Sequence, residues 1–419
     1  MTAVSARSIK FISHCDQGGR GDGVQIMVHR GYAYIGHGFS NGITVVDVRD
    51  PKRPRTVNFL PCPPNTRALH LQTHDNLLLA VNAPSMWTMH VSEKAYFSGS
   101  AANLLQGQEK TYTSGMRVYD ISQPATPREI AFMPVDGIGP HRIWYVGGRY
   151  AYVSIHFSDF TDQVLAVVDM AEPTRPVIAG KWWLPGMWSG GGETPTWPSG
   201  RRYALHHALV AGNLAYGAWR DGGLTVLDVA DPTQPTLLSH RNLDPPFGGG
   251  THSPLPLPER NLLVLADEPN FANCSQGLRY IWIFDVRVPT NPVSIATLPI
   301  PTDDDYCAKG GNFGAHNLWE NRPGGFQSSR LIFARYYNAG VRAYDIDKSL
   351  PAARDRLIRA AKPRAHVRPA PRSSASHPIE RLLYRCAGRD VFDRRQCRPQ
   401  YTAVRGLGRA RRPTGVSSR

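Results

Sequence analysis

The chain has 419 residues, of which 41% are hydrophobic, and its formal net charge is +15. No segment approaches the roughly 18 consecutive apolar residues of a membrane-spanning helix, and no apolar secretory signal is visible in the first 25 residues. We therefore expect a globular protein that does not bind membranes and lies in the cytoplasm. The cysteines follow no metal-binding spacing, so we expect free thiols at Cys15, Cys62, Cys274, Cys307, Cys386 and Cys397.

A fifteen-residue pattern recurs six times along the chain. It reads ITVVDVRDPKRPRTV from Ile43 and returns from Met116, Leu165, Leu224, Ile281 and, incompletely, Val341. The same slot always holds aspartate, at Asp47, Asp120, Asp169, Asp228, Asp285 and Asp345. In the first five copies two prolines three residues apart follow this aspartate. A repeat of roughly 50 residues indicates a solenoid, a propeller or an array.

Each copy predicts a strand, a turn and a second strand. The run before the aspartate is rich in β-branched and aromatic residues, and the prolines cannot donate to a ladder, so they belong in the turn. A second apolar pair, with Gly, Asn or Asp between its halves, lies upstream, as in VQIMVHRGYAYIGH from Val24. Each repeat therefore predicts a four-stranded antiparallel meander, A to D, and such meanders arranged around an axis form a β-propeller.

The V-V-D-V-x-D-P-x-x-P strings and the G-x-A-Y strands resemble the LVIVD-repeat family of bacterial and archaeal β-propellers. The resemblance covers about residues 20–350. It implies the fold and says little about activity, because propellers carry many unrelated functions.

Seven blades are expected in an all-β propeller over residues 1–350. Six motif copies account for six blades, and the run SIKFISH from Ser8 to His14 predicts an extra strand that closes the seventh. The three further strands of that blade would have to follow residue 360, where the sequence does not supply them.

Residues 351–419 form an Arg-rich segment without repeats, which we expect to be disordered. It holds 18 Lys and Arg residues against four Asp and Glu, so it carries +14 of the net charge. One interpretation is a basic arm for nucleic acid or an anionic membrane. We favour an out-of-frame translation, because a one-nucleotide shift within residues 377–404 permits codons for MYLTDGNAGLNILQ, which resembles strands B and C of another repeat. Resequencing the DNA between codons 345 and 419 tests this interpretation.

A histidine recurs where predicted strand A begins, and Asp22 lies near this slot in the first repeat. Strand A lines the central channel of a propeller, so repeat symmetry brings these side chains together at one mouth. Imidazoles that converge from several strands commonly hold copper, iron or zinc. The fourth repeat has two adjacent histidines at this slot, His206 and His207, and we take His207 as the ligand. The predicted metal ligands are therefore His70, His141, His207, His252 and His316. Two alternatives are a structural ring, in which each histidine bonds the next blade, and a polar pocket without metal.

The residues that follow strand B lie at the same mouth, because strand B is antiparallel to strand A. They are polar and varied, which suits a catalytic or substrate-binding role, although solvated turns would look similar. The predicted catalytic residues are His37, His156, Asp221, Asp267 and Glu268. The predicted substrate pocket includes Arg220, Arg335 and Tyr336.

A long tryptophan-rich connection from Lys181 to Arg202 also belongs to this mouth. Connections of this length are usually functional or disordered, and this one is too apolar for a disordered linker. We expect a lid or pocket wall that includes Trp183 and Trp188, or a patch that binds a protein partner.

Two functions follow from these features. The first is a metal-dependent enzyme that acts on a small organic molecule, with an oxidoreductase favoured over a hydrolase or lyase by analogy with histidine-lined propeller channels that serve copper and iron oxidases. The second is a non-catalytic scaffold that docks a protein through its aromatic loops. No nucleic-acid partner is expected.

Overall fold

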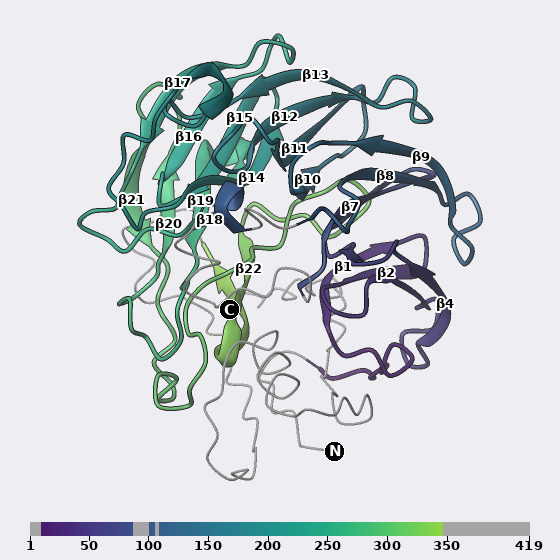
Figure 1. Ribbon diagram of the computed structural model, residues 1–419. Helices are drawn as coiled ribbons and strands as arrows, with labels where there is room; N and C mark the ends of the chain where they lie inside the picture. Colours follow the sequence, from purple (N-terminus) through teal and green to yellow (C-terminus); the bar gives the residue numbers. More distant parts are fainter. Residues whose placement is uncertain (1–9, 87–99, 105–108, 347–419) are drawn as a thin grey trace, which may run out of the picture.

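The computed structural model describes residues 10–86, 100–104 and 109–346, and its regular secondary structure is almost wholly antiparallel strand (Figure 1). No helix among these residues is long and apolar enough to cross a membrane. The strands are β1 (Gly23–His29), β2 (Tyr32–His37), β3 (Gly42–Asp47), β4 (Arg55–Pro61), β5 (Thr66–Arg67), β6 (Leu71–His74), β7 (Leu77–Pro84), β8 (Gly115–Asp120), β9 (Arg128–Pro134), β10 (Gly139–Trp144), β11 (Tyr150–His156), β12 (Val164–Asp169), β13 (Val177–Trp182), β14 (Tyr203–Ala211), β15 (Leu214–Arg220), β16 (Leu224–Asp228), β17 (Thr236–Arg241), β18 (Thr251–Leu257), β19 (Leu262–Asp267), β20 (Ile281–Asp285), β21 (Val293–Thr297), β22 (Leu331–Tyr336) and β23 (Gly340–Asp345). The short helices are α3 (Ala101–Leu104), η1 (Ser189–Gly191), η2 (Pro258–Arg260) and η3 (Tyr337–Ala339).

These strands form successive sheets that follow one another around a common centre (Figure 1). Blade 1 is β1–β4, blade 2 is β5–β9, blade 3 is β10–β13, blade 4 is β14–β17, blade 5 is β18–β21, and blade 6 contains β22 and β23. In blade 6 a single bridge between Leu318 and Ala334 marks strand A. The predicted all-β propeller is therefore confirmed. Seven blades remain a prediction, because any strand after residue 346, together with the Arg-rich segment, lies outside the described residues.

The predicted N-terminal strand differs from the structure. Residues 10–14 form no strand, and residues 8 and 9 lie outside the described part of the chain. Instead, the Ser13 hydroxyl donates a hydrogen bond to the carbonyl oxygen of Pro51, at 2.5 Å. The segment thus lies against the C–D turn of blade 1 and does not extend a ladder.

The recurring aspartate ends strand C, as predicted, and it builds the turn that follows. The side-chain oxygen of Asp120 accepts a hydrogen bond from the backbone N–H two residues later, at 2.8 Å. The same bond recurs at Asp47, Asp169, Asp228 and Asp285. This local bond favours a turn over continued pairing, so the motif specifies where each blade reverses direction.

The core lies between blades. One buried cluster joins side chains of blades 2, 3 and 4, and others join blades 1 and 2, 4 and 5, and 5 and 6. Gly36 shows how closely blades approach, because a Cβ there would lie 2.3 Å from the carbonyl oxygen of Ala68. The strands near the axis are consequently buried on both faces, which explains their continuous apolar runs.

Candidate metal centre

β-Bulges place histidines at the centre of the propeller. In blade 3, His141 is the extra residue of a bulge between Pro140 and Arg142. His252 has the same position in strand A of blade 5. A bulge bends a strand and turns its extra side chain away from the regular alternation. In blade 1 the corresponding residue is Val24, so that blade has no imidazole at this position.

Five histidines from blades 2 to 6 contact one another in series and are called the histidine array below. Their ring centroids are separated by 5.0, 4.8, 3.4 and 4.4 Å in the order His70, His141, His206, His252 and His316. The ring of Tyr337 stacks on His316 at 4.6 Å and extends the series. The structure thus brings together side chains that are up to 267 residues apart in the sequence.

In blade 4, His206 belongs to the array and His207 does not. The pairing of β14 with β15 shifts register between Tyr203 and His207, so simple alternation does not tell which histidine faces the axis. The His207 ring lies 6.4 Å from that of His206, and its Nδ1 approaches Glu320 at 3.6 Å. The predicted ligand His207 is therefore replaced by His206 as the array member.

The carboxylate of Glu268 meets the array at two histidines. Its Oε2 lies 3.4 Å from Nε2 of His252, and its Oε1 lies 3.3 Å from Nε2 of His316. Arg220 contacts Oε2 at 3.4 Å, and the Tyr337 hydroxyl donates a hydrogen bond to Oε1. Ligand atoms of His252, Glu268 and His316 all lie within 4.8 Å of one another, and all three residues are buried.

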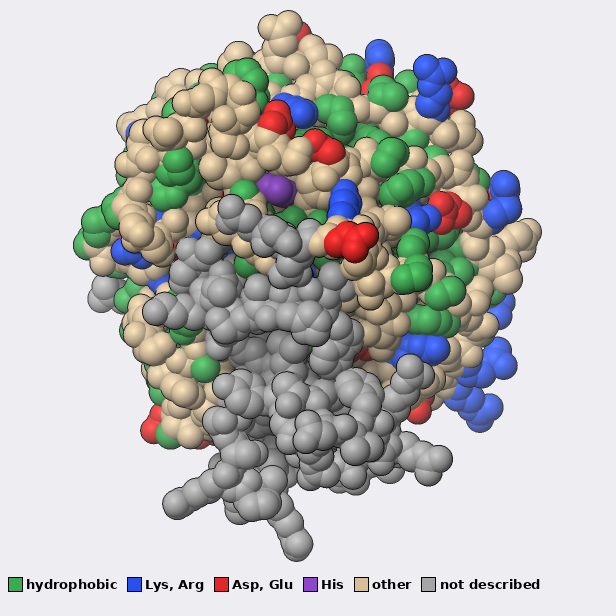
Figure 2. Space-filling model, viewed as in Figure 1, with side chains coloured by type: hydrophobic (Ala, Val, Ile, Leu, Met, Phe, Trp, Pro, Cys, Tyr) green, Lys and Arg blue, Asp and Glu red, His purple; other side chains and the backbone are tan. Residues whose placement is uncertain are grey.

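Burial favours the neutral form of four imidazoles of the array. It lowers the pKa of His70, His141, His206 and His252 well below the usual 6.5, and nearby arginines and histidines lower it further. Histidine accordingly contributes little to the visible face of the molecule (Figure 2). The Nδ1–H group of His206 donates to the carbonyl oxygen of His252 at 2.8 Å, which leaves its Nε2 with a lone pair. This bond to the next blade is the contact expected of a structural ring.

Charged and polar side chains follow the histidines of the array along the chain of blades 2, 3 and 6. The buried guanidinium of Arg142 contacts Nδ1 of His70 at 3.2 Å and donates to Asn317 of blade 6. Glu320 of blade 6 accepts a hydrogen bond from Gln72 of blade 2, at 3.1 Å. These contacts cross the channel and connect blades that are distant in the sequence.

Two predicted catalytic histidines are engaged elsewhere. His37 contacts Asp22 at 2.9 Å and Thr44 at 2.8 Å, one with each ring nitrogen. His156 accepts from the backbone N–H of Ile138 and approaches the carbonyl oxygen of Phe160, each at 3.0 Å. Both side chains tie the ends of their blades together, and neither contacts the histidine array.

The predicted acids Asp221 and Asp267 have partners of their own. Backbone N–H groups of Arg202 and Gly250 donate to Asp221. Trp282 and Thr251 donate to Asp267, at 2.6 and 3.2 Å. Burial raises the pKa of Asp267 to about 7, against the lowering effect of these hydrogen bonds. Of the five predicted catalytic residues, only Glu268 contacts the array.

The predicted substrate-pocket residues do not gather in one place. Trp183 donates to Glu193 within the tryptophan-rich connection, and the 38%-exposed Trp188 donates to Asp159 in the loop between β11 and β12. Tyr336 is fully buried in the core of blade 6, and it is the next residue, Tyr337, that reaches the array. Arg335 lies over the Tyr337 ring, 5.8 Å from its centroid. Arg220 is the one predicted pocket residue that contacts Glu268.

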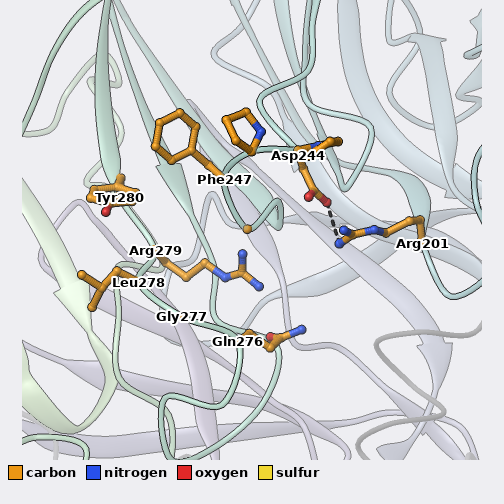
Figure 3. A pocket seen from close by; sticks show the side chains of 11 residues that line it. Arg201, Asp244, Phe247, Gln276, Gly277, Leu278, Arg279 and Tyr280 are labelled. Carbon is orange, nitrogen blue, oxygen red and sulfur yellow. Dashed lines mark ion pairs between the residues drawn. The ribbon is translucent and has the colours of Figure 1, made fainter.

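A cavity of about 480 Å³ opens between the connections that flank blade 5 (Figure 3). It is lined by Arg201, Asp244, Pro245, Pro246, Phe247, Gly248, Gln276, Gly277, Leu278, Arg279 and Tyr280. Its lining comes mainly from the D-to-A connection after β17 and the B-to-C connection after β19, and Arg201 is added from the connection that precedes β14. Both connections lie at the mouth where strand A begins.

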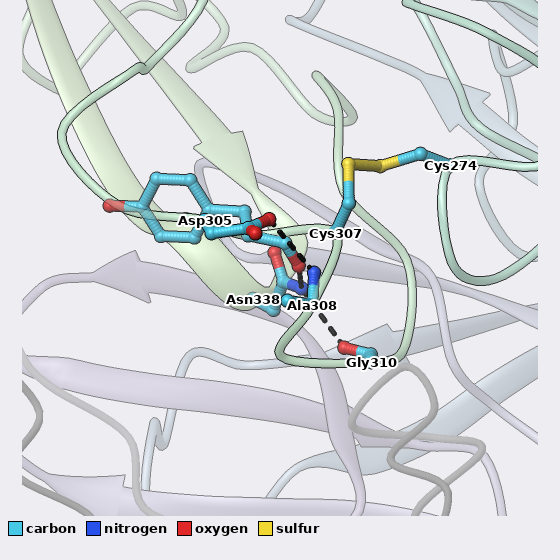
Figure 4. The surroundings of a disulfide bond; sticks show 7 residues. Cys274, Asp305, Cys307, Ala308, Gly310 and Asn338 are labelled. Carbon is cyan, nitrogen blue, oxygen red and sulfur yellow. Dashed lines mark hydrogen bonds between the residues drawn. A yellow bond between two sulfur atoms is a disulfide. The ribbon is translucent and has the colours of Figure 1, made fainter.

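A disulfide joins two connections at this mouth (Figure 4). Cys274 lies after β19 and Cys307 after β21, and their Cα atoms are 5.6 Å apart. The expectation of free thiols is therefore wrong for this pair, because the fold brings together two cysteines 33 residues apart. Cys15 and Cys62 are free.

Two residues near the array carried no signal that we recognised in the sequence. Tyr337 follows the predicted strand by one residue and has a φ of +23°, which turns it out of the β22 alternation. Arg142 lies in strand A beside His141, and a polar residue within an apolar run is the pattern that could have marked it.

Comparison with protein families matches the LVIVD repeat to residues 20–58, 142–182 and 208–242. These stretches correspond to blades 1, 3 and 4. The chain thus carries the LVIVD repeat in these three stretches, as its motifs indicated. No curated protein matches it.

Several solved structures share the fold. A protein of Bacteroides fragilis, provisionally named a 6-phosphogluconolactonase, is 10% identical with a TM-score of 0.51, over 80% of this chain and 82% of its own. A protein of Bacteroides uniformis with the same provisional name is 11% identical with a TM-score of 0.51, over 78% of this chain and 80% of its own. The protein U3-55K is 9% identical with a TM-score of 0.50, over 86% of both chains. At these identities the likeness shows the propeller-like fold alone.

Proposed function

We propose that this protein is a metal-dependent enzyme that acts on a small organic molecule at the histidine-lined mouth of its channel. The observation that carries the proposal is the convergence of His252, Glu268 and His316, with ligand atoms within 4.8 Å of one another. Two nitrogens and one carboxylate in a buried position form a donor set that zinc and iron commonly take in proteins.

The donor geometry is compatible with one ion. Ligand atoms about 2.1 Å from a tetrahedral ion lie roughly 3.4 Å apart. The Nε2 atoms of His252 and His316 each lie near this distance from a different oxygen of Glu268, at 3.4 and 3.3 Å, and one ligand atom from each of the three residues lies within 4.8 Å of the others. Once bound, such a metal would supply Lewis-acid or redox chemistry.

The surrounding residues prepare the carboxylate for this role. Glu268 is buried, and Arg220 and Tyr337 hold its two oxygens from different blades. Outer partners of this kind orient ligands and affect metal affinity. His70, His141 and His206 continue the array away from the three donors, and we assign them hydrogen bonds to a bound substrate.

The reaction class depends on the metal. Iron or copper would support the oxidoreductase predicted from the sequence, whereas zinc would favour hydrolysis. The provisional lactonase names belong to structures that share only the fold, so they do not decide between these classes. The cytoplasmic location remains a prediction, and the disulfide is a bond more typical of oxidising compartments.

Elemental analysis of the purified full-length protein tests the proposal, both as isolated and after loading with zinc, iron(II) or copper(II) followed by dialysis. We expect about one tightly bound ion per chain. His252→Ala, His316→Ala and Glu268→Gln should each lose most of it. His14→Ala is the matched control, because His14 is exposed and remote from the array, and it should retain the metal.

Wild-type protein that holds no more metal than the His252→Ala variant after loading would overturn the proposal. The array would then be a structural ring, of which the bond from His206 to His252 already provides one link. The scaffold hypothesis would become the one to pursue, beginning with the exposed Trp188.

A further inference from the structure

A buried arginine without a partner faces the cavity beside blade 5. Arg279 is only 2% exposed, yet no other residue in the described part of the chain forms a hydrogen bond or ion pair with its guanidinium. Figure 3 shows the guanidinium pointing toward the space between Asp244, Arg201 and Gln276. An unpaired buried charge is costly, so a group that pairs with it from within the cavity would be strongly favoured.

The nearby carboxylates do not satisfy this arginine. Asp221, Asp244 and Asp267 attract its charge, but none forms an ion pair with it. Each has another partner: backbone N–H groups hold Asp221, Trp282 and Thr251 hold Asp267, and Arg201 lies 2.7 Å from Asp244. The cavity therefore contains one unpaired cation among groups that are already paired.

The backbone leaves room for this guanidinium. A Cβ on Gly248 would lie 1.7 Å from Nη1 of Arg279, so only glycine permits the observed side-chain position. Phe247, which packs 4.8 Å from Trp282, and Tyr280 add aromatic surface to the wall. Polar recognition beside an apolar wall is the usual composition of a small-molecule site, and about 480 Å³ is a typical size.

The cavity and the candidate metal centre share two segments of the chain. Gly248 lines the cavity, and His252 follows it by four residues in the same connection and strand. The other segment begins with Glu268 and reaches the cavity at Gln276. The N–H group of Glu268 donates to the carbonyl oxygen of Gly250 at 2.7 Å, which joins the two segments between the sites.

We propose that this cavity binds the carboxylate of a small organic acid through Arg279 and thereby anchors the substrate next to the metal centre. The substrate role rests on the proposed function, but carboxylate binding can be measured without it. A planar guanidinium matches a carboxylate with two parallel hydrogen bonds. A phosphate dianion fits less well, because only one unpaired cation faces the cavity and the carboxylate of Asp244 lies beside it.

Isothermal titration of the full-length protein with benzoate, phenylacetate and hexanoate tests the proposal. We expect saturable binding of at least one acid, and at least about tenfold weaker binding of its neutral amide, because the amide lacks the charge-assisted pair. Arg279→Gln should weaken the acid at least about tenfold, and Arg279→Lys should restore part of the affinity. Arg175→Gln, an exposed arginine remote from the cavity, is the control and should bind as wild type does.

Gly248→Ala provides a second variant that keeps the charge but displaces the guanidinium, and it should also weaken binding. Failure of all three acids to bind below about 10 mM, or equal binding of acid and amide, would overturn the proposal. Tighter binding of phenyl phosphate than of benzoate would overturn the choice of a carboxylate. Glu268→Gln should lose metal yet bind the acid within about twofold of wild type, so failure of the metal proposal is distinguishable from failure of this one.

Discussion

Replacing Asp267 by asparagine should stabilise the protein at alkaline pH. This side chain is buried, and its two oxygens accept hydrogen bonds from Trp282 and Thr251. An asparagine has nearly the same shape: its oxygen can accept from Trp282, and its amide can donate to the hydroxyl of Thr251. The substitution therefore removes a buried charge and keeps both contacts.

The magnitude follows from the pKa of Asp267, which burial raises from 3.8 to about 7 in the folded protein. Between about pH 4 and pH 7 the folded protein holds a proton that the unfolded chain has released, so the free energy of unfolding falls as pH rises through this window. The raised pKa corresponds to a total loss of about 4 kcal/mol. Asparagine does not titrate, so the variant's advantage should grow by about 3 kcal/mol between pH 5 and pH 8.

Urea unfolding monitored by tryptophan fluorescence at several pH values measures this difference. Asp285→Asn is the matched control, because hydrogen bonds from Arg287 lower the pKa of that partly exposed carboxyl, and we expect no gain in stability there. A stability difference between Asp267→Asn and wild type that stays constant from pH 5 to pH 8 would refute the reasoning.

Two further predictions concern stability. Cys274→Ser opens a loop closed over 33 residues and should lower the free energy of unfolding by about 4 kcal/mol, with Cys62→Ser as a free-thiol control. Chemical denaturation measures the effect, and a free energy of unfolding of the wild-type protein that reductant does not change would contradict the prediction. Arg202→Gln strips the buried Asp162 of an ion pair at 2.8 Å and should cost about 3 to 5 kcal/mol. Adding Asp162→Asn to this variant should recover part of the loss in the same assay. If Arg202→Gln alone is as stable as the double variant, the assigned cost of breaking the buried ion pair is wrong.

The blades could be predicted because their signals are local. Each aspartate bonds the backbone only two residues ahead, and each proline pair excludes pairing at its own position, so a short motif is enough to mark strand C, the turn and strand D. Repetition of that motif then implied the propeller without any knowledge of contacts between blades.

The site could be predicted only in part. Repeat symmetry was sufficient to indicate that histidines of several blades converge, because equivalent slots of a propeller meet at its axis. It did not distinguish His206 from His207, since a register shift in β14 breaks the alternation there. Repeat symmetry also placed Tyr336 in the site, whereas it is Tyr337 that reaches the array. The reason is that the chain leaves β22 through a positive φ at Tyr337.

The sequence by itself thus determined the repeat, the strand order and the gathering of imidazoles at one mouth, since these depend on local patterns multiplied by symmetry. The tertiary structure decided which side chains meet: Glu268 meets His252 and His316, Cys274 meets Cys307, and Arg279 meets no partner among the residues that the structure describes. Such pairings depend on bulges and on connections of different lengths, which differ from blade to blade. A repeated motif cannot encode them, because they arise where the repeats are not alike.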